Sequence, residues 1–184
     1  MYATKNKITN LKTGLPNILA TDFGNLVVAG RHDSGGCSSE TRGIVAGGNT
    51  SPADVNTIQY ITIASTGNSQ DFGDANTNCS AGSAASSTRM LMGGGLTPSA
   101  SNIIEYITMA TLGNSANFGD LTTQRGLMAI GVSSDKIRGI FAGGVSSDVI
   151  DYVSIATQGD AVDFGNLTAA RYSSAVMSND HGGL

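Results

Sequence analysis

Apolar and polar residues alternate in short runs along most of this 184-residue chain. The clearest runs are three near-copies of one another at residues 58–64, 104–110 and 150–156. Short runs that are rich in β-branched and aromatic residues and bounded by Gly, Ser and Asn predict strands and turns. Since no stretch keeps an apolar period of 3.6 residues, no helix is predicted. The pattern therefore predicts an all-β protein.

The same landmarks recur in the same order along the chain. Four Phe-Gly pairs follow one another at intervals of 49, 46 and 46 residues and begin at Phe23, Phe72, Phe118 and Phe164. Each interval holds an arginine, a glycine pair five residues later and a tyrosine: Arg42, Arg89, Arg138; Gly47-Gly48, Gly94-Gly95, Gly143-Gly144; Tyr60, Tyr106, Tyr152. A second arginine follows Phe-Gly at Arg31, Arg125 and Arg171, and Cys79 takes its place in the second copy. A fixed period of this kind indicates an array of repeats that stabilise one another.

Each repeat is expected to form four short strands. The first begins at the second arginine, as in residues 125–130, and a Ser-rich turn follows at residues 37–39, 86–87 or 133–134. The second strand, as in residues 138–142, ends at the glycine pair. The third strand contains the tyrosine, and the fourth surrounds Phe-Gly.

Both faces of the third strand are apolar. Side chains alternate along a strand, so Ile58, Tyr60 and Ala64 are expected to point to one side. Ile61 and Ile63 then point to the other side. A sheet with one face in water would keep that face polar. Two apolar faces instead favour sheets packed between similar neighbours, as in radially stacked blades.

The order of arginine, apolar strand, glycine pair, tyrosine strand and aromatic residue resembles the kelch repeat over residues 19–184. In that family the glycine pair ends the second strand and the tyrosine lies on the third, and phenylalanine stands here where the family has tryptophan. The resemblance implies kelch-like β-propeller blades, about three complete ones plus partial ones, in an array left incomplete or closed by other strands or chains. The expected organisation is an N-terminal arm over residues 1–18, units at about 25–72, 73–118 and 119–164, and a partial unit at 165–184.

Composition and charge narrow the classes of partner. The net charge is −4 and the ten basic residues are scattered, which argues against nucleic acid. No apolar run approaches the roughly 20 residues of a membrane span, and residues 1–7 do not look like a secretory signal. Cys37 and Cys79 occupy different places in the repeat, so we expect two free, buried thiols rather than a disulfide framework.

Candidate catalytic chemistry is sparse. Asp-Phe-Gly at residues 22, 71 and 163 matches a magnesium-binding tripeptide of kinases, but the other kinase motifs are missing and the repeat period indicates a structural role. The only histidines are His32 and His181, and neither belongs to a triad or a metal-ligand pattern. We therefore expect no enzyme activity, no catalytic or metal-binding residues and no cofactor, and the ligand-binding residues are unknown.

Two interpretations of the repeated landmarks remain open. Arg42, Arg89 and Arg138 either bond between blades, to carbonyls or to the aspartates near Phe-Gly, or line an anion-binding channel. Loss of stability in Arg138→Ala would favour the first interpretation, and loss of binding with stability kept would favour the second. The tyrosines and phenylalanines are expected to pack in the core rather than stack on sugars. The glycine pairs are expected to have positive φ or a close backbone neighbour.

The amino-acid sequence of the repeat is similar to that of kelch-like arrays in phage tail-fibre and other virion proteins. This resemblance implies a non-enzymatic structural or binding module in the virion, with loops at residues 49–57, 96–102 and 145–148 presented for recognition. The expected partners are a host-surface glycan, other virion proteins or copies of this chain, and neither nucleic acid nor membrane insertion is expected. The alternative is a cellular kelch-type protein-interaction scaffold, which would be cytoplasmic.

Overall fold

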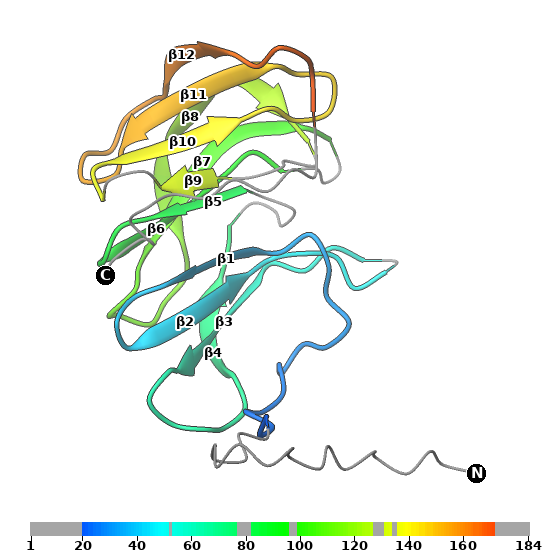
Figure 1. Cartoon of the computed structure of the whole chain (residues 1–184), viewed down its shortest axis with the longest axis vertical. Coiled ribbons are helices and arrows are strands. Elements are labelled where there is room, and N and C mark those ends of the chain that lie inside the picture. Colours follow the sequence, from blue (N-terminus) through cyan, green and yellow to red (C-terminus); the bar gives the residue numbers. More distant parts are fainter. Residues whose placement is uncertain are drawn as a thin grey trace, which may run out of the picture.

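The computed structural model describes residues 20–51, 53–76, 82–95, 99–126, 131–133 and 136–171. The described residues form three four-stranded antiparallel sheets and no helix (Figure 1). Sheet 1 contains β1 (Gly35–Ser38), β2 (Arg42–Ala46), β3 (Thr57–Thr62) and β4 (Gln70–Asp74). Sheet 2 contains β5 (Gly82–Ala85), β6 (Arg89–Gly93), β7 (Ser101–Thr108) and β8 (Ala116–Arg125). Sheet 3 contains β9 (Gly131–Ser133), β10 (Arg138–Ala142), β11 (Val149–Ser154) and β12 (Val162–Asn166). The all-β class and the four-stranded unit are thus confirmed.

The first strand of the unit is where the prediction was wrong. Arg125 does not begin a first strand but ends β8, because β8 keeps its pairing with β7 as far as Arg125 opposite Ser101. In sheet 3 the first strand is β9, and residues 127–130 lie outside the described part of the chain. The Ser-rich turn also starts later than predicted, because Cys37 and Ser38 still pair with β2.

Sheet 2 lies between sheets 1 and 3, and both of its faces are buried. One apolar cluster joins sheets 1 and 2 and includes Ile58 and Met90. A second cluster joins sheets 2 and 3 and includes Ile104 and Phe141. All four side chains are fully buried, and complete burial of such a side chain stabilises a fold by about 1.5–3 kcal/mol. The two apolar faces predicted for the third strand are confirmed for β7, which lies in the middle of the stack.

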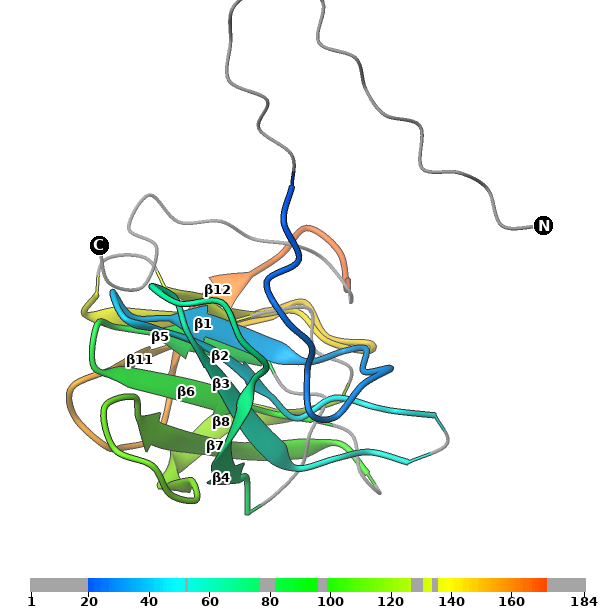
Figure 2. The same ribbon diagram turned by 90° about the horizontal axis from the view of Figure 1, so that it is seen from below.

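The first strands of the sheets lie next to one another in the middle of the molecule, where β1 contacts β5 and β5 contacts β9 (Figure 1). The fourth strands β4, β8 and β12 form the opposite edges of the sheets. In Figure 2 the blue segment that begins at residue 20 approaches from outside the sheets and leads into β1. The connections between the second and third strands of the three sheets all lie at the same end of the stack, on the right in Figure 1.

A β-bulge in each sheet explains the Phe-Gly landmark. The pairing of the third and fourth strands shifts at Ile58/Gln59, Ile104/Glu105 and Ile150/Asp151, so that the phenylalanine is the extra residue. Each phenylalanine ring meets the tyrosine of its own sheet edge to face, with centroids 6.0–6.1 Å apart. Core packing is confirmed for Phe72 and Phe118, which are 2% and 3% exposed. It is wrong for Phe164, which is 55% exposed because no sheet in the described part of the chain covers it.

Candidate functional site

Three equivalent backbone pairings connect consecutive repeats at their periphery, and we call each an outer joint. Between sheets 2 and 3, the Gly159 N–H donates to Phe118 O (2.9 Å) and the Ala161 N–H donates to Asp120 O (2.8 Å). The Asp120 N–H donates in turn to Asp160 Oδ1 (3.0 Å). The same three bonds recur between residues 72–74 and 113–115 and between residues 23–25 and 67–69. The Phe-Gly segment of one repeat is therefore hydrogen-bonded through its backbone to the turn between the third and fourth strands of the next repeat.

The glycine of each outer joint lies too close to the neighbouring backbone to carry a side chain. A Cβ on Gly119, where φ is +157°, would lie 2.3 Å from Gly159 O. The corresponding distances are 2.4 Å from Gly73 to Gly113 O and 2.2 Å from Gly24 to Gly67 O. Contact between repeats thereby accounts for the glycine of the Phe-Gly pair at these three positions.

The first repeated arginine connects neighbouring sheets through its guanidinium. Arg42 Nη1 donates to Met109 O (2.6 Å), and Arg89 Nη1 donates to Ile155 O (2.7 Å). The two guanidinium carbons lie 4.8 Å and 4.6 Å from the ring centroids of Tyr60 and Tyr106. The hydrogen bond to a backbone carbonyl of the next sheet, one of the two predicted interpretations, is confirmed for these two arginines. The third, Arg138, begins β10 in sheet 3.

Replacing Arg89 with alanine is expected to lower the free energy of unfolding by about 1–2 kcal/mol, because it removes one charge-assisted hydrogen bond and one cation–π contact. Urea unfolding followed by circular dichroism measures this loss. Arg89→Lys keeps the charge but not the planar fork, and should give an intermediate loss. Unchanged stability in Arg89→Ala would instead favour the interpretation that the repeated arginines line an anion-binding channel.

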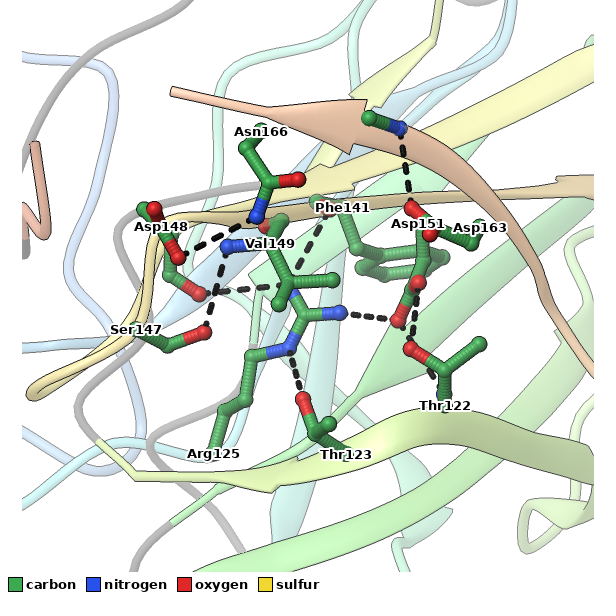
Figure 3. Close-up of polar contacts among 12 residues, drawn as sticks. Thr122, Thr123, Arg125, Phe141, Ser147, Asp148, Val149, Asp151, Asp163 and Asn166 are labelled. Atoms are coloured by element: carbon green, nitrogen blue, oxygen red, sulfur yellow. Dashed lines mark hydrogen bonds and ion pairs between the residues drawn. The ribbon is translucent and has the colours of Figure 1, made fainter. Parts of the chain in front are cut away.

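The second repeated arginine is buried where sheet 2 meets sheet 3 (Figure 3). Arg125 is 0% exposed, and its Nη1 donates to the carbonyl oxygens of Phe141, Gly143 and Val149 at 3.2, 3.2 and 2.9 Å. Its Nη2 forms an ion pair with the carboxylate of Asp151, which is also fully buried. We call this cluster the arginine joint. Burial lowers the pKa of the Arg125 guanidinium, and the charge of Asp151 acts in the opposite direction.

Thr122 completes the arginine joint from β8. Its backbone N–H donates to Asp151 Oδ2 (3.1 Å) and its hydroxyl donates to Asp151 Oδ1 (2.6 Å). Both carboxylate oxygens therefore have partners, as a buried charge requires. This fully buried ion pair fixes β8 against β11.

A related contact occurs at the start of the chain, where Arg31 Nη1 donates to Thr57 O (3.0 Å). Gln59 stands where Asp151 stands in sheet 3, and its Oε1 accepts from the Val27 N–H at 3.1 Å. The polar residue next to the tyrosine is buried in all three sheets: Gln59, Glu105 and Asp151 are 1%, 5% and 0% exposed. The sequence interpretation missed this position, although a polar residue recurring in an otherwise apolar strand was a usable signal.

The glycine pairs make room for the second arginine. Gly144 has a φ of +133°, and a Cβ there would lie 3.1 Å from Arg125 Cβ. Gly48 has a φ of +105°, and a Cβ there would lie 2.8 Å from Arg31 Cγ. Both expectations for these glycines, positive φ and a close neighbour, are confirmed at these two positions.

The predicted recognition loops lie beside the contacts of Arg31 and Arg125, at one end of the stack (Figure 1). Their bounds are shorter than predicted, because residue 57 belongs to β3 and residues 101–102 belong to β7. The first loop is held by Asn49, whose Nδ2 donates to Asp54 Oδ1 (2.7 Å). In the last loop Ser146 adopts a φ of +61°, and the Val145 N–H donates to Gly126 O at 3.1 Å. Residues 52 and 96–98 lie outside the described chain.

In the described part of the chain, the candidate His32 lies beside the carboxylate of its sequence neighbour. His32 Nε2 lies 3.9 Å from Asp33 Oδ2, with both side chains about half exposed. No group of three or more His, Cys, Asp and Glu residues in the described ranges is placed to hold a metal ion. His181 and Cys79 fall outside those ranges. No helix in the described part of the chain is long and apolar enough to cross a membrane.

Cys37 is a free thiol, as predicted, but it is half-buried rather than buried; desolvation by the surrounding residues raises its pKa to about 12. We therefore expect alkylation of Cys37 by iodoacetamide at pH 8 to be slow in the native protein and fast in urea, measured site by site by mass spectrometry. The unfolded thiol ionises near pH 9, so stability should fall as the pH rises from about 9 to 12. A native Cys37 that reacts as fast as free cysteine would contradict this environment.

The chain matches no protein-family model, and no curated protein is significantly similar to it.

Proposed function

We propose that this chain is a non-enzymatic structural and binding module, made of kelch-like propeller blades, in a phage virion appendage such as a tail fibre. Its loops contact a host-surface glycan or a neighbouring virion protein. The observation that carries the proposal is the threefold recurrence of one four-stranded meander with its first strands adjacent. Adjacent inner strands and peripheral fourth strands are what blades of a propeller would present.

The joints support a role in presenting loops. The outer joint and the arginine joint hold both ends of β8 against sheet 3. The loops between second and third strands leave this rigid base at one end and differ in length between repeats. Variable loops on a rigid repeat scaffold are a common arrangement for recognition.

Two measurements test the proposal. Mass spectrometry of purified virus particles should detect the chain, and a soluble cytosolic protein as its partner would favour the cellular scaffold instead. On an array of bacterial surface glycans, Val145→Asp should weaken binding, because Val145 is 44% exposed in a candidate loop. Leu112→Asp is the matched control, since Leu112 is 52% exposed in the turn at the opposite end of its sheet. Equal loss in both variants would contradict loop recognition.

A further inference from the structure

The outer joint is made three times within the chain, and its Phe-Gly side is present a fourth time. Residues 163–167 have the same sequence as residues 22–26, Asp-Phe-Gly-Asn-Leu. Phe164 is 55% exposed, whereas its counterparts Phe72 and Phe118 are 2% and 3% exposed. A Cβ on Gly165 would meet no described atom within 4 Å. Within the described chain, this copy of the joint therefore lacks its partner loop.

The strands beside Phe164 present the same apolar face that sheets 1 and 2 bury. By strand register, Ile140 and Ile150 of sheet 3 correspond to Leu91 and Ile104 of sheet 2. Leu91 and Ile104 are completely buried in the contact with sheet 3. Ile140 and Ile150 are only half-buried. We call this surface the open face of sheet 3.

Sheet 1 presents the complementary face at the other end of the stack. Ile63 corresponds to Met109 and Ile155, which are each 1% exposed in the two internal contacts, yet Ile63 is 44% exposed. A cavity of about 290 Å³ lies on the same face and is lined by Val45 and Ile61 among others. We call this surface the open face of sheet 1. The two contacts within the chain pair the same two kinds of face. Ile58 of sheet 1 packs with Met109 of sheet 2, and Ile104 of sheet 2 packs with Ile155 of sheet 3.

The partner loop on sheet 1, residues 67–69, is occupied by residues 23–25 of the same chain. This occupant is held less well than the fourth strands of the internal joints, because Phe23, Leu26 and Val27 are 38%, 40% and 64% exposed. β12 of a second copy is part of a complete sheet, so at the same position it would bury more apolar surface than residues 23–27 do. Burial of apolar surface therefore favours exchange of one Asp-Phe-Gly-Asn-Leu segment for the other.

We propose that the open face of sheet 3 docks onto the open face of sheet 1 of a second copy of this chain. Residues 163–167 of the first copy replace residues 22–26 of the second copy against its loop 67–69. Since the two faces differ, the contact runs head to tail and builds a ring or a filament. Neither face includes the candidate recognition loops, so self-association and ligand binding can fail independently.

Light scattering after size exclusion of the full chain, over a wide range of concentration, tests this contact. The wild type is expected to associate as concentration rises. Phe164→Asp blocks the open face of sheet 3 and Ile63→Asp blocks that of sheet 1, so each variant alone should remain a monomer. Mixing the two variants should give a heterodimer and nothing larger, because one intact face of each kind remains. Leu112→Asp, at an exposed position outside both faces, should associate as the wild type does.

A gentler variant separates loss of association from loss of folding. Gly165→Ala adds one methyl group that meets no described atom in its own chain. In an outer joint with a second copy, this methyl group would lie too close to a glycine carbonyl oxygen, since the corresponding distances in the three outer joints within the chain are 2.2–2.4 Å. We expect it to lose association while the circular dichroism spectrum stays unchanged. A wild type that is monomeric at every concentration, or a mixture of Phe164→Asp and Ile63→Asp that stays monomeric, would overturn the proposal.

Discussion

Asp151→Ala is expected to lower the free energy of unfolding by about 3–5 kcal/mol, because it leaves the guanidinium of Arg125 buried without its counter-charge. Both side chains of this ion pair are 0% exposed. The N–H and the hydroxyl of Thr122 also lose their acceptor. Since the chain has no tryptophan, urea unfolding is best followed by circular dichroism.

Two further variants show whether this loss belongs to the ion pair. Asp163→Ala removes an exposed carboxylate of the same sheet, which accepts from the Gly165 N–H (2.9 Å) and acts on Arg125 only through its charge, and should cost about 0.5–1 kcal/mol. Arg125→Met combined with Asp151→Ala should cost less than the sum of the two single changes, since residues in direct contact are not additive. If Asp151→Ala costs no more than Asp163→Ala, the arginine joint does not stabilise the fold.

The second large effect is expected for Gly119→Ala, with a loss of about 3 kcal/mol in the free energy of unfolding. The new Cβ would lie 2.3 Å from Gly159 O, so sheets 2 and 3 must separate at the outer joint or the backbone must distort. The φ of +157° at Gly119 adds strain for any residue with a side chain. Thermal unfolding and urea unfolding should both show the loss.

Gly165→Ala is the matched control for the outer joint, because it shares the bulge and the positive φ of +142° but meets no described atom. It should cost about 1 kcal/mol from backbone strain alone, measured at concentrations where the chain is monomeric. The difference between the two variants isolates the close contact between backbones. Equal costs would mean that strain, and not contact between repeats, requires glycine at this position.

Local pattern predicted the strands well where pairing partners lie within the same repeat. Residues 138–142 form β10 as predicted, because the glycine pair that ends this strand acts on its own backbone. The prediction was wrong at Arg125, where nothing in the local pattern shows that β8 continues along β7. Strand length depends there on pairing with residues more than twenty positions earlier.

The contacts that define the joints were much less predictable. From the sequence, Arg42 and Arg89 could either bond to the next repeat or line an anion-binding channel. Only the stacking of the sheets places the carbonyl of Met109 beside Arg42, which is 67 residues away in the sequence. The ion pair of Arg125 with Asp151 was not predicted at all. A repeated arginine shows that a partner exists, but its identity depends on which strands face each other.

The sequence by itself determined the all-β class, the period of the repeat and the two apolar faces of the third strand, because alternation and turn-forming glycines act over a few residues. Tertiary structure decided which of those faces are covered. Phe23, Phe72 and Phe164 all lie in Asp-Phe-Gly, yet Phe72 is 2% exposed while the other two are 38% and 55% exposed. Burial depends on whether a neighbouring sheet is present, and the local sequence around each phenylalanine does not encode that neighbour.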